Sequence, residues 1–261
     1  MSAGMQVLAS FLVGGVWVAA ATAAAERRGT RLGGFIGGMP STLAVALLFV
    51  GWTGGGPAAA AAAAVVPLAF AVNALFLLLF AALTARWGFH AGILAALAAW
   101  AVLQGAIVAL DGAPLWGSVV GGALALAICR VGFHRALKIQ ARPPGGPKGG
   151  LFGLALRAGS SGLLVAAAVG ASLRWGAVAG GVLASLPVVF LSTLFISNRS
   201  MGLGAARAMA RALVFSATIN CSVFALAFHF AVSAAPLVPA FALSYGLTAL
   251  LAVPVYRLKL G

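Results

Sequence analysis

The sequence is short of acidic residues. Only two of its 261 residues are Asp or Glu, against 16 Lys or Arg, so the formal net charge is +14. The two acidic residues, Glu26 and Asp111, lie at the ends of apolar segments. Cation carriers, and carriers driven by protons or sodium ions, commonly depend on a carboxylate buried in the membrane. The lack of such a carboxylate disfavours a cationic substrate and carboxylate-mediated proton coupling, and it favours neutral or anionic cargo.

Residues from which catalytic and metal sites are built are also scarce. Charged residues make up 7% of the chain, whereas soluble domains usually carry about a quarter. Cys129 and Cys221 both fall in apolar segments, which argues against a disulfide framework. His90 and His229 are isolated from other ligand-type residues. Because there is also no phosphate-binding glycine loop and no Ser/His/Asp or Cys/His set, we expect no enzyme, no bound metal and no cofactor.

Apolar residues are what the chain has in abundance. They make up 63% of it, and the mean hydropathy is +1.14. Nine apolar runs are each near or above the ~20 residues that a helix needs to cross a bilayer. They lie at about 5–23, 31–51, 58–84, 89–110, 114–132, 151–171, 175–196, 204–231 and 236–256. The sequence therefore predicts an all-α polytopic membrane protein with nine transmembrane helices.

The basic residues indicate how these helices are oriented. With nine spans, fourteen of the 16 Lys and Arg lie on or near one side of the membrane, and Arg174 is the clear exception. Basic loops stay in the cytoplasm and attract anionic lipid headgroups, which explains the charge better than binding to nucleic acid does. No basic residue precedes the first run, whereas Arg27, Arg28 and Arg31 follow it. We expect a multi-pass protein of the inner (plasma) membrane, with its N-terminus outside and its C-terminus in the cytoplasm.

The chain contains an internal repeat with an offset of 147 residues. Two prolines, two asparagines and two glycine pairs keep this offset: Pro40 and Pro187, Asn73 and Asn220, and 33–34 and 180–181. Alanine matches are common in such a chain. Matches of proline, asparagine and paired glycines that all keep one offset over forty residues are not common. The sequence therefore predicts two copies of one ancestral unit.

The repeat divides the chain into three parts. They are a first four-helix repeat at 1–112, a linker helix and basic cytoplasmic loop at 113–150, and a second four-helix repeat at 151–261. The linker helix adds one membrane crossing, so the second copy enters the membrane from the opposite side. We therefore expect two inverted four-helix repeats joined by a linker helix, an arrangement found in many secondary transporters.

The stretch "GGFIGGMPST" at 33–42 places four glycines and a proline inside a predicted span. Pro40 lacks an amide hydrogen and clashes with the preceding turn, so it should kink or break the helix. Ser41 and Thr42 can satisfy the carbonyls that the break frees. Pro187 should act likewise in the second copy, where Ser185, Ser192 and Thr193 can satisfy the freed carbonyls. A pair of broken helices in an inverted repeat indicates a central binding site, whereas a kink that serves packing alone is the alternative.

Four further polar residues lie within predicted spans. Asn73 and Asn220 should face the interior, either as hydrogen-bonding contacts between helices or as the lining of a polar cavity. Arg157, with Ser160 one turn away, can point toward an anionic group in that cavity or extend its side chain to the inner headgroups. With Pro40, Ser41, Thr42 and Pro187, these residues form the candidate substrate site.

Residues 177–216, "AVAGGVLASLPVVFLSTLFISNRSMGLGAARAMARALVFS", resemble the core of the GlpM family of four-helix bacterial inner-membrane proteins. The shared features are a proline-centred helix, a short basic loop and a start to the next helix rich in small residues and arginine. The first half resembles the family more weakly. The resemblance implies a role in envelope or exopolysaccharide physiology, without an established activity. A looser analogy exists with drug/metabolite transporters, although the buried glutamate of the small multidrug exporters is missing.

Together these features predict a secondary transporter or facilitator that moves a small anionic or neutral metabolite by alternating access. Its partners would be that small molecule and the anionic lipids at its cytoplasmic loops, with no nucleic acid; no sequence feature specifies an oligomeric state. One alternative is a flippase for lipids or lipid-linked sugars, which would need a groove open sideways to the bilayer. The other is a non-transporting scaffold for envelope or exopolysaccharide assembly.

Overall fold

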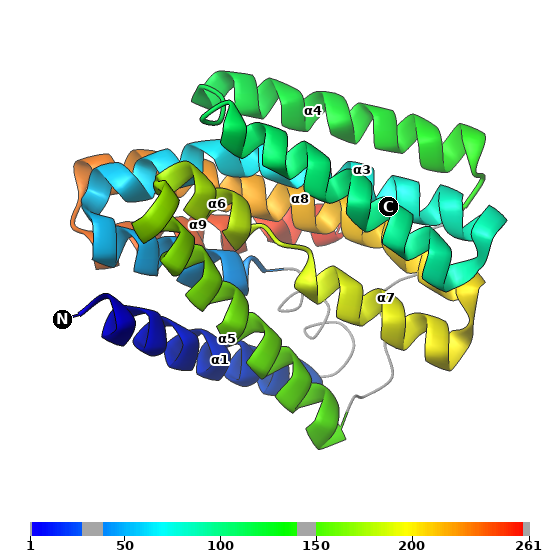
Figure 1. Cartoon of the computed structure of the whole chain (residues 1–261), viewed down its shortest axis with the longest axis horizontal. Coiled ribbons are helices and arrows are strands. Elements are labelled where there is room, and N and C mark those ends of the chain that lie inside the picture. The colour runs from blue at the N-terminus through cyan, green and yellow to red at the C-terminus, as the bar shows by residue number, and fades with distance from the viewer. Residues whose placement is uncertain (1, 28–38, 140–149, 258–261) are drawn as a thin grey trace.

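The computed structural model describes residues 2–27, 39–139 and 150–257, and every element in these ranges is a helix (Figure 1). In chain order they are α1 (Ala3–Arg27), α3 (Ser41–Ala109), α4 (Leu115–Val131), the π-helix η1 (Gly132–Ala136), α5 (Gly150–Trp175), α6 (Ala177–Ala184), α7 (Val188–Met201), α8 (Leu203–Ala234) and α9 (Leu237–Arg257). The predicted all-helical class is confirmed for this part of the chain.

The 69 residues of α3 do not form one straight helix. At ~1.5 Å per residue such a helix would be about 100 Å long, far more than a bilayer is thick. Gly55 (φ 82°, ψ 176°) and Gly88 (φ 74°, ψ 177°) leave the helical conformation, and only glycine adopts it at little cost. They divide α3 into a first (41–54), a middle (56–87) and a last segment (89–109), and the chain folds back at each glycine (Figure 1).

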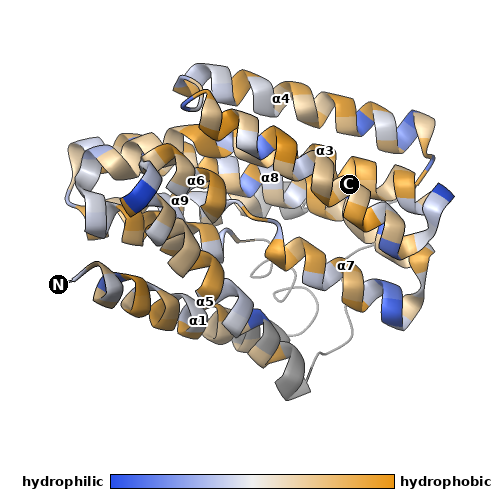
Figure 2. Cartoon of the chain, in the orientation of Figure 1, coloured by the Kyte–Doolittle hydropathy of each residue, from blue (hydrophilic) through white to orange (hydrophobic). Residues whose placement is uncertain are grey.

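The outer surface of the bundle is apolar. Large hydrophobic side chains are exposed on several helices, for example Val102 (72% exposed), Trp116 (68%) and Leu250 (69%), and apolar residues occur along every helix (Figure 2). Among the described residues, five helices are long and apolar enough to cross a membrane: Ala3–Ala21, Ser41–Ala109, Leu115–Ala136, Ala177–Met201 and Leu203–Ala234. This surface is compatible with a multi-pass membrane protein, because lipid is the solvent in which exposed apolar side chains cost nothing.

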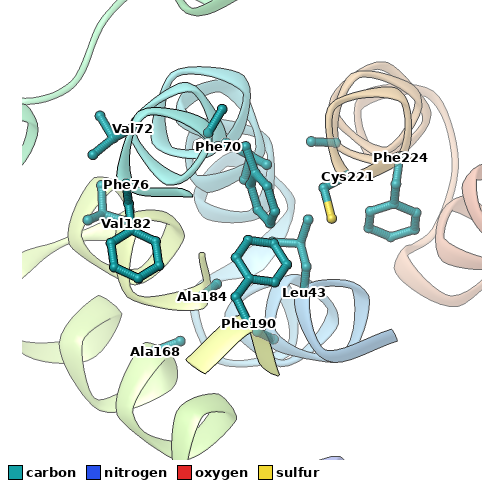
Figure 3. Close-up of a cluster of buried hydrophobic side chains, with 14 of the residues drawn as sticks. Leu43, Phe70, Val72, Phe76, Ala168, Val182, Ala184, Phe190, Cys221 and Phe224 are labelled. Carbon is teal, nitrogen blue, oxygen red and sulfur yellow. The ribbon is translucent and has the colours of Figure 1, made fainter. Parts of the chain in front are cut away.

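The core forms around the middle segment of α3, which packs against α4, α6 and α8. Phe76 and Phe80 from this segment and Phe224 and Phe228 from α8 are essentially inaccessible. Figure 3 shows this core with Phe76 beside Val182 of α6. α6, the first part of the broken helix, therefore lies within this core.

Glycine allows α6 to come close to its neighbours. A Cβ atom at Gly181 would collide with the carbonyl of Ala62 in the middle segment of α3, and one at Gly180 would lie 2.7 Å from Ser172 of α5. The small residues Gly180 and Gly181 therefore allow close helix contacts here. Gly176, four residues before Gly180, has a different role: its φ of 89° makes the tight turn between α5 and α6.

The contact between α1 and α5 is reciprocal. A Cβ atom at Gly15 would lie 3.2 Å from the carbonyl of Ala158, and one at Gly162 would lie 2.6 Å from the carbonyl of Phe11. Gly162 is 147 positions after Gly15, and Ala158 is 147 after Phe11. Matched residues that contact each other in both directions are the geometry that a two-fold relation produces.

Helix ends recur with the same offset. Pro40 (φ −76°, ψ 47°) and Pro187 (φ −79°, ψ 36°) each immediately precede a helix. Gly202 (φ 82°, ψ 174°) is 147 positions after Gly55 (φ 82°, ψ 176°), and the two residues have nearly the same backbone conformation. The 147-residue offset therefore relates backbone conformations as well as residue types.

Candidate functional site

The break between α6 and α7 is the centre of the candidate site. α6 ends at Ala184 and α7 begins at Val188, so the prediction that Pro187 interrupts a helix is confirmed. Tight bonds close the end of α6, where the Ser185 amide donates to the Val182 carbonyl at 3.1 Å and the Ser185 hydroxyl donates to the same carbonyl at 2.7 Å. The carbonyl of Ser185 is left to find a partner on another helix.

Asn73 supplies that partner. Its Nδ2 donates to the Ser185 carbonyl at 2.6 Å, and its Oδ1 accepts a bond from Trp100 Nε1, also at 2.6 Å. Asn73 is fully buried and Trp100 is 9% exposed. One amide thus joins the middle and last segments of α3 to the broken helix. Asn73 forms an interhelical contact, the first of the two roles that its sequence position allows.

Gln104 completes this network, and the list of candidate residues drawn from the sequence omits it. Its Nε2 donates to the Ala69 carbonyl at 3.0 Å and to Ser185 Oγ at 3.4 Å. Gln104 is only 3% exposed, and its Oε1 has no hydrogen-bond partner among the described residues. Its sequence signal is the same as that of Asn73, an amide within an apolar run. We call Asn73, Trp100, Gln104 and Ser185 the break network.

A second helix start lies at Pro40. Ser41 begins the first segment of α3, and both Ser41 and Thr42 are half-buried. Residues 28–38, which carry Gly33 and Gly34, lie outside the described residues, so the helix predicted before Pro40 is not described. Figure 3 shows Leu43, just after this start, with its side chain toward Phe190, just after the start of α7. Leu43 and Phe190 are themselves 147 positions apart.

Asn220 lies on α8 and is 9% exposed, so it is buried as predicted. The surroundings of Asn73 are not repeated around it. The positions 147 after Trp100 and Gln104 are Leu247 and Leu251, which offer no polar side-chain group. Trp100 and Gln104 therefore have no polar counterparts at the matched positions of the second half.

Arg157 and Ser160 lie on α5, and both are half-buried. Ser160 Oγ donates to the Arg157 carbonyl at 3.2 Å, which is a bond within the helix. Ser161, the next residue, is 1% exposed, and its Oγ has no hydrogen-bond partner among the described residues. No described side-chain hydrogen bond connects Arg157 or Ser160 to the break network, so their role stays a prediction.

Ser192 and Thr193 were expected to satisfy carbonyls freed by the Pro187 break, as was Ser185. Of the three, only Ser185 does so. Ser192 Oγ and Thr193 Oγ1 instead donate to the Val189 carbonyl, at 3.0 and 2.7 Å, within α7. Both hydroxyls lie after the break, and a side chain one turn into a helix reaches the carbonyl behind it in the same helix.

Two apolar grooves open on the surface of the described helices. The α7 groove, of about 400 Å³, is lined by Phe89, His90, Ile93, Leu94, Leu191, Ser192, Phe195 and Ile196. The α4 groove, of about 450 Å³, is lined by Leu78, Ala127, Ile128, Val131 and Gly132. The described part of the chain contains no group of three or more residues that could hold a metal ion.

Comparisons with known proteins found no match among protein-family models, curated proteins or solved structures.

Proposed function

We propose that the chain is a secondary transporter or facilitator for a small anionic or neutral metabolite, built from two inverted four-helix repeats joined by α4. Nine spans follow if the three segments of α3 are counted separately, the residues before Pro40 complete the first segment, and α6 with α7 forms one broken span. The reciprocal contacts of Gly15 and Gly162, together with the repeated conformations at Pro40 and Pro187, support a two-fold relation between the halves.

The observation that carries this proposal is the pair of helix starts at Ser41 and Val188. Each follows a proline, and neither has a side-chain cap. The first amides of a helix lack acceptors within it, and the helix dipole makes this end positive. Transporters with inverted repeats use such half-helix ends, near the midplane, to bind anionic groups of the substrate. Thr42, in the first turn of α3, and Asn220, on α8, are candidate side chains for this site, and Arg157 and Ser160 of α5 remain candidates.

The test is ligand-dependent thermal stabilisation of the purified protein. The panel holds inorganic phosphate, sugar phosphates, small carboxylates, neutral sugars and lipid phosphates. A ligand that binds only the folded state raises the melting temperature in proportion to the logarithm of its concentration. Thr42→Val keeps the side-chain shape and removes the hydroxyl, so it should weaken the stabilisation. Asn198→Ala on α7 is the matched control, and it should leave the stabilisation unchanged.

A flippase for lipids or lipid-linked sugars is the second candidate, and the α7 groove favours it. This groove is apolar, lies between α7 and the last segment of α3, and extends to Leu191 in the first turn of α7. Leu94→Trp would fill it at a position that is 66% exposed. If lipid phosphates alone stabilise the protein, and Leu94→Trp abolishes that effect, the flippase replaces the transporter. Stabilisation by no panel member would favour a scaffold for envelope assembly.

A further inference from the structure

The α4 groove lies between α4 and the middle segment of α3, away from the break network. Leu78 forms one wall, and Ala127, Ile128 and Val131 form the other. Gly132 brings the two walls together, because a Cβ atom there would lie 2.8 Å from Leu78 Cδ1. Ile128 is 55% exposed and Val131 is 52% exposed. In a membrane, the molecules available to cover such a surface are lipid acyl chains.

Positive charge gathers at one end of this groove. The basic rim consists of Arg130, His134, Arg135 and Lys138, all of them exposed. Residues 127, 128 and 131 share one face of α4, and Arg130 in its last turn and Arg135 in η1 lie at the end of that helix. Figure 2 shows hydrophilic residues at this end of α4. Asp111, one of the two acidic residues in the chain, precedes α4 at the opposite end, so it does not neutralise the rim.

The rim is held in place by buried contacts. η1 is a π-helix, a form that often marks functional positions, and its Phe133 is fully buried. The amide of Ile139 donates to the Phe133 carbonyl at 3.1 Å. Arg211 of α8 donates from Nη1 to the Ile139 carbonyl. These contacts fix the backbone that carries the basic side chains, so the charges stay at the end of the groove.

We propose that the α4 groove and the basic rim bind one anionic phospholipid of the surrounding bilayer. An acyl chain lies along Leu78, Ile128 and Val131, and the phosphate lies among Arg130, Arg135 and Lys138. Charge complementarity selects the occupant, since a zwitterionic lipid offers the same acyl chain without a net negative headgroup. The site is independent of the proposed transport function, because it shares no residue with the helix starts or the break network.

Native mass spectrometry of the intact chain measures this binding directly. The protein is titrated with phosphatidylglycerol or with phosphatidylcholine carrying the same acyl chains. A basic residue near an anionic lipid surface contributes about a fivefold gain in binding. The double variant Arg130→Gln/Arg135→Gln should therefore weaken phosphatidylglycerol binding about 25-fold and leave phosphatidylcholine binding unchanged. The control Arg174→Gln/Arg199→Gln loses the same charge on α5 and α7, and it should bind phosphatidylglycerol as the parent does.

A second pair of variants tests the groove without changing the charge. Ala127→Trp fills the groove from an exposed position and should displace the lipid. Val120→Trp places the same side chain on an exposed position of α4 outside the groove and should not. Each variant is first compared with the parent in thermal unfolding without lipid. Equal binding of both lipids, or unchanged phosphatidylglycerol binding in Arg130→Gln/Arg135→Gln or in Ala127→Trp, would overturn the proposal.

Discussion

At the scale of single residues, a proline and an asparagine from distant parts of the chain depend on each other. Pro187 ends regular helix geometry in a place where water cannot satisfy the freed backbone groups. Asn73, which is 112 positions from Ser185 in sequence, provides the missing donor through its 2.6 Å bond to the Ser185 carbonyl. Trp100 then fixes the orientation of the Asn73 amide. A broken helix is stable here because its open carbonyl has a dedicated partner.

Asn73→Ala should therefore lower the stability of the protein. The substitution leaves the Trp100 N–H and the Ser185 carbonyl buried without their shared partner. Hydrogen bonds between membrane helices average about 0.6 kcal/mol, and two are lost here with little room for replacement, so we expect a loss of about 1–2 kcal/mol. The midpoint of SDS-induced unfolding measures it. Asn198→Ala, on the half-buried surface of α7, should change the midpoint little, and equal effects would contradict the role of Asn73.

At the scale of elements, glycine determines which helices can touch. α1 and α5 approach until Gly15 faces the Ala158 carbonyl and Gly162 faces the Phe11 carbonyl. Without the hydrophobic effect to hold helices together in lipid, such close van der Waals packing is the main attraction between them. The same close packing holds α6 against the middle segment of α3, where Gly181 lies against Ala62.

Gly162→Leu should separate α1 from α5. Its Cβ would lie 2.6 Å from the Phe11 carbonyl, and backbone cannot yield as a flexible side chain does. We expect a loss of about 1–3 kcal/mol, which is the usual cost of overpacking. Gly159→Leu is a matched control on the same helix, since a Cβ there meets nothing within 4 Å. Thermal unfolding of both variants gives the comparison, and similar melting temperatures would contradict the close contact.

At the scale of the whole molecule, equivalent turns lie at opposite ends. The turn at Gly55 and the turn at Gly202 share one backbone conformation and are 147 positions apart. In Figure 1 the start of α8 lies at the right-hand end of the bundle, whereas the first fold-back of α3 lies at the left-hand end. This placement is what we expect if α4 adds one membrane crossing between two inverted copies, as proposed above.

Cysteine labelling tests this inverted topology in intact cells. Trp52→Cys should react with a membrane-impermeant maleimide added outside, and Met201→Cys should react only after the membrane is opened. Trp52 is 51% exposed and Met201 is 36% exposed, so a cysteine at either position can react once the reagent reaches its side of the membrane. The native Cys129 and Cys221 are buried, which keeps the background low. Labelling of both sites from the same side would contradict the inversion.

The sequence by itself determined the helical class of the described residues, the helix interruption at Pro187 and the 147-residue offset. These follow from composition and from local chemistry, because runs of apolar residues form helices in lipid and proline cannot continue one. Burial of Asn73 and Asn220 follows for the same reason, since an amide avoids hydrocarbon.

Only the tertiary structure decided what those residues touch. Lipid-facing and core-facing side chains are both apolar here, so periodicity does not identify the inner face of a helix. The partnership of Asn73 with Ser185, the inclusion of Gln104 in the break network, and the basic rim beside the α4 groove all join residues from different helices. Such pairings depend on how helices cross, and helix crossing is set by small residues and close packing rather than by hydropathy.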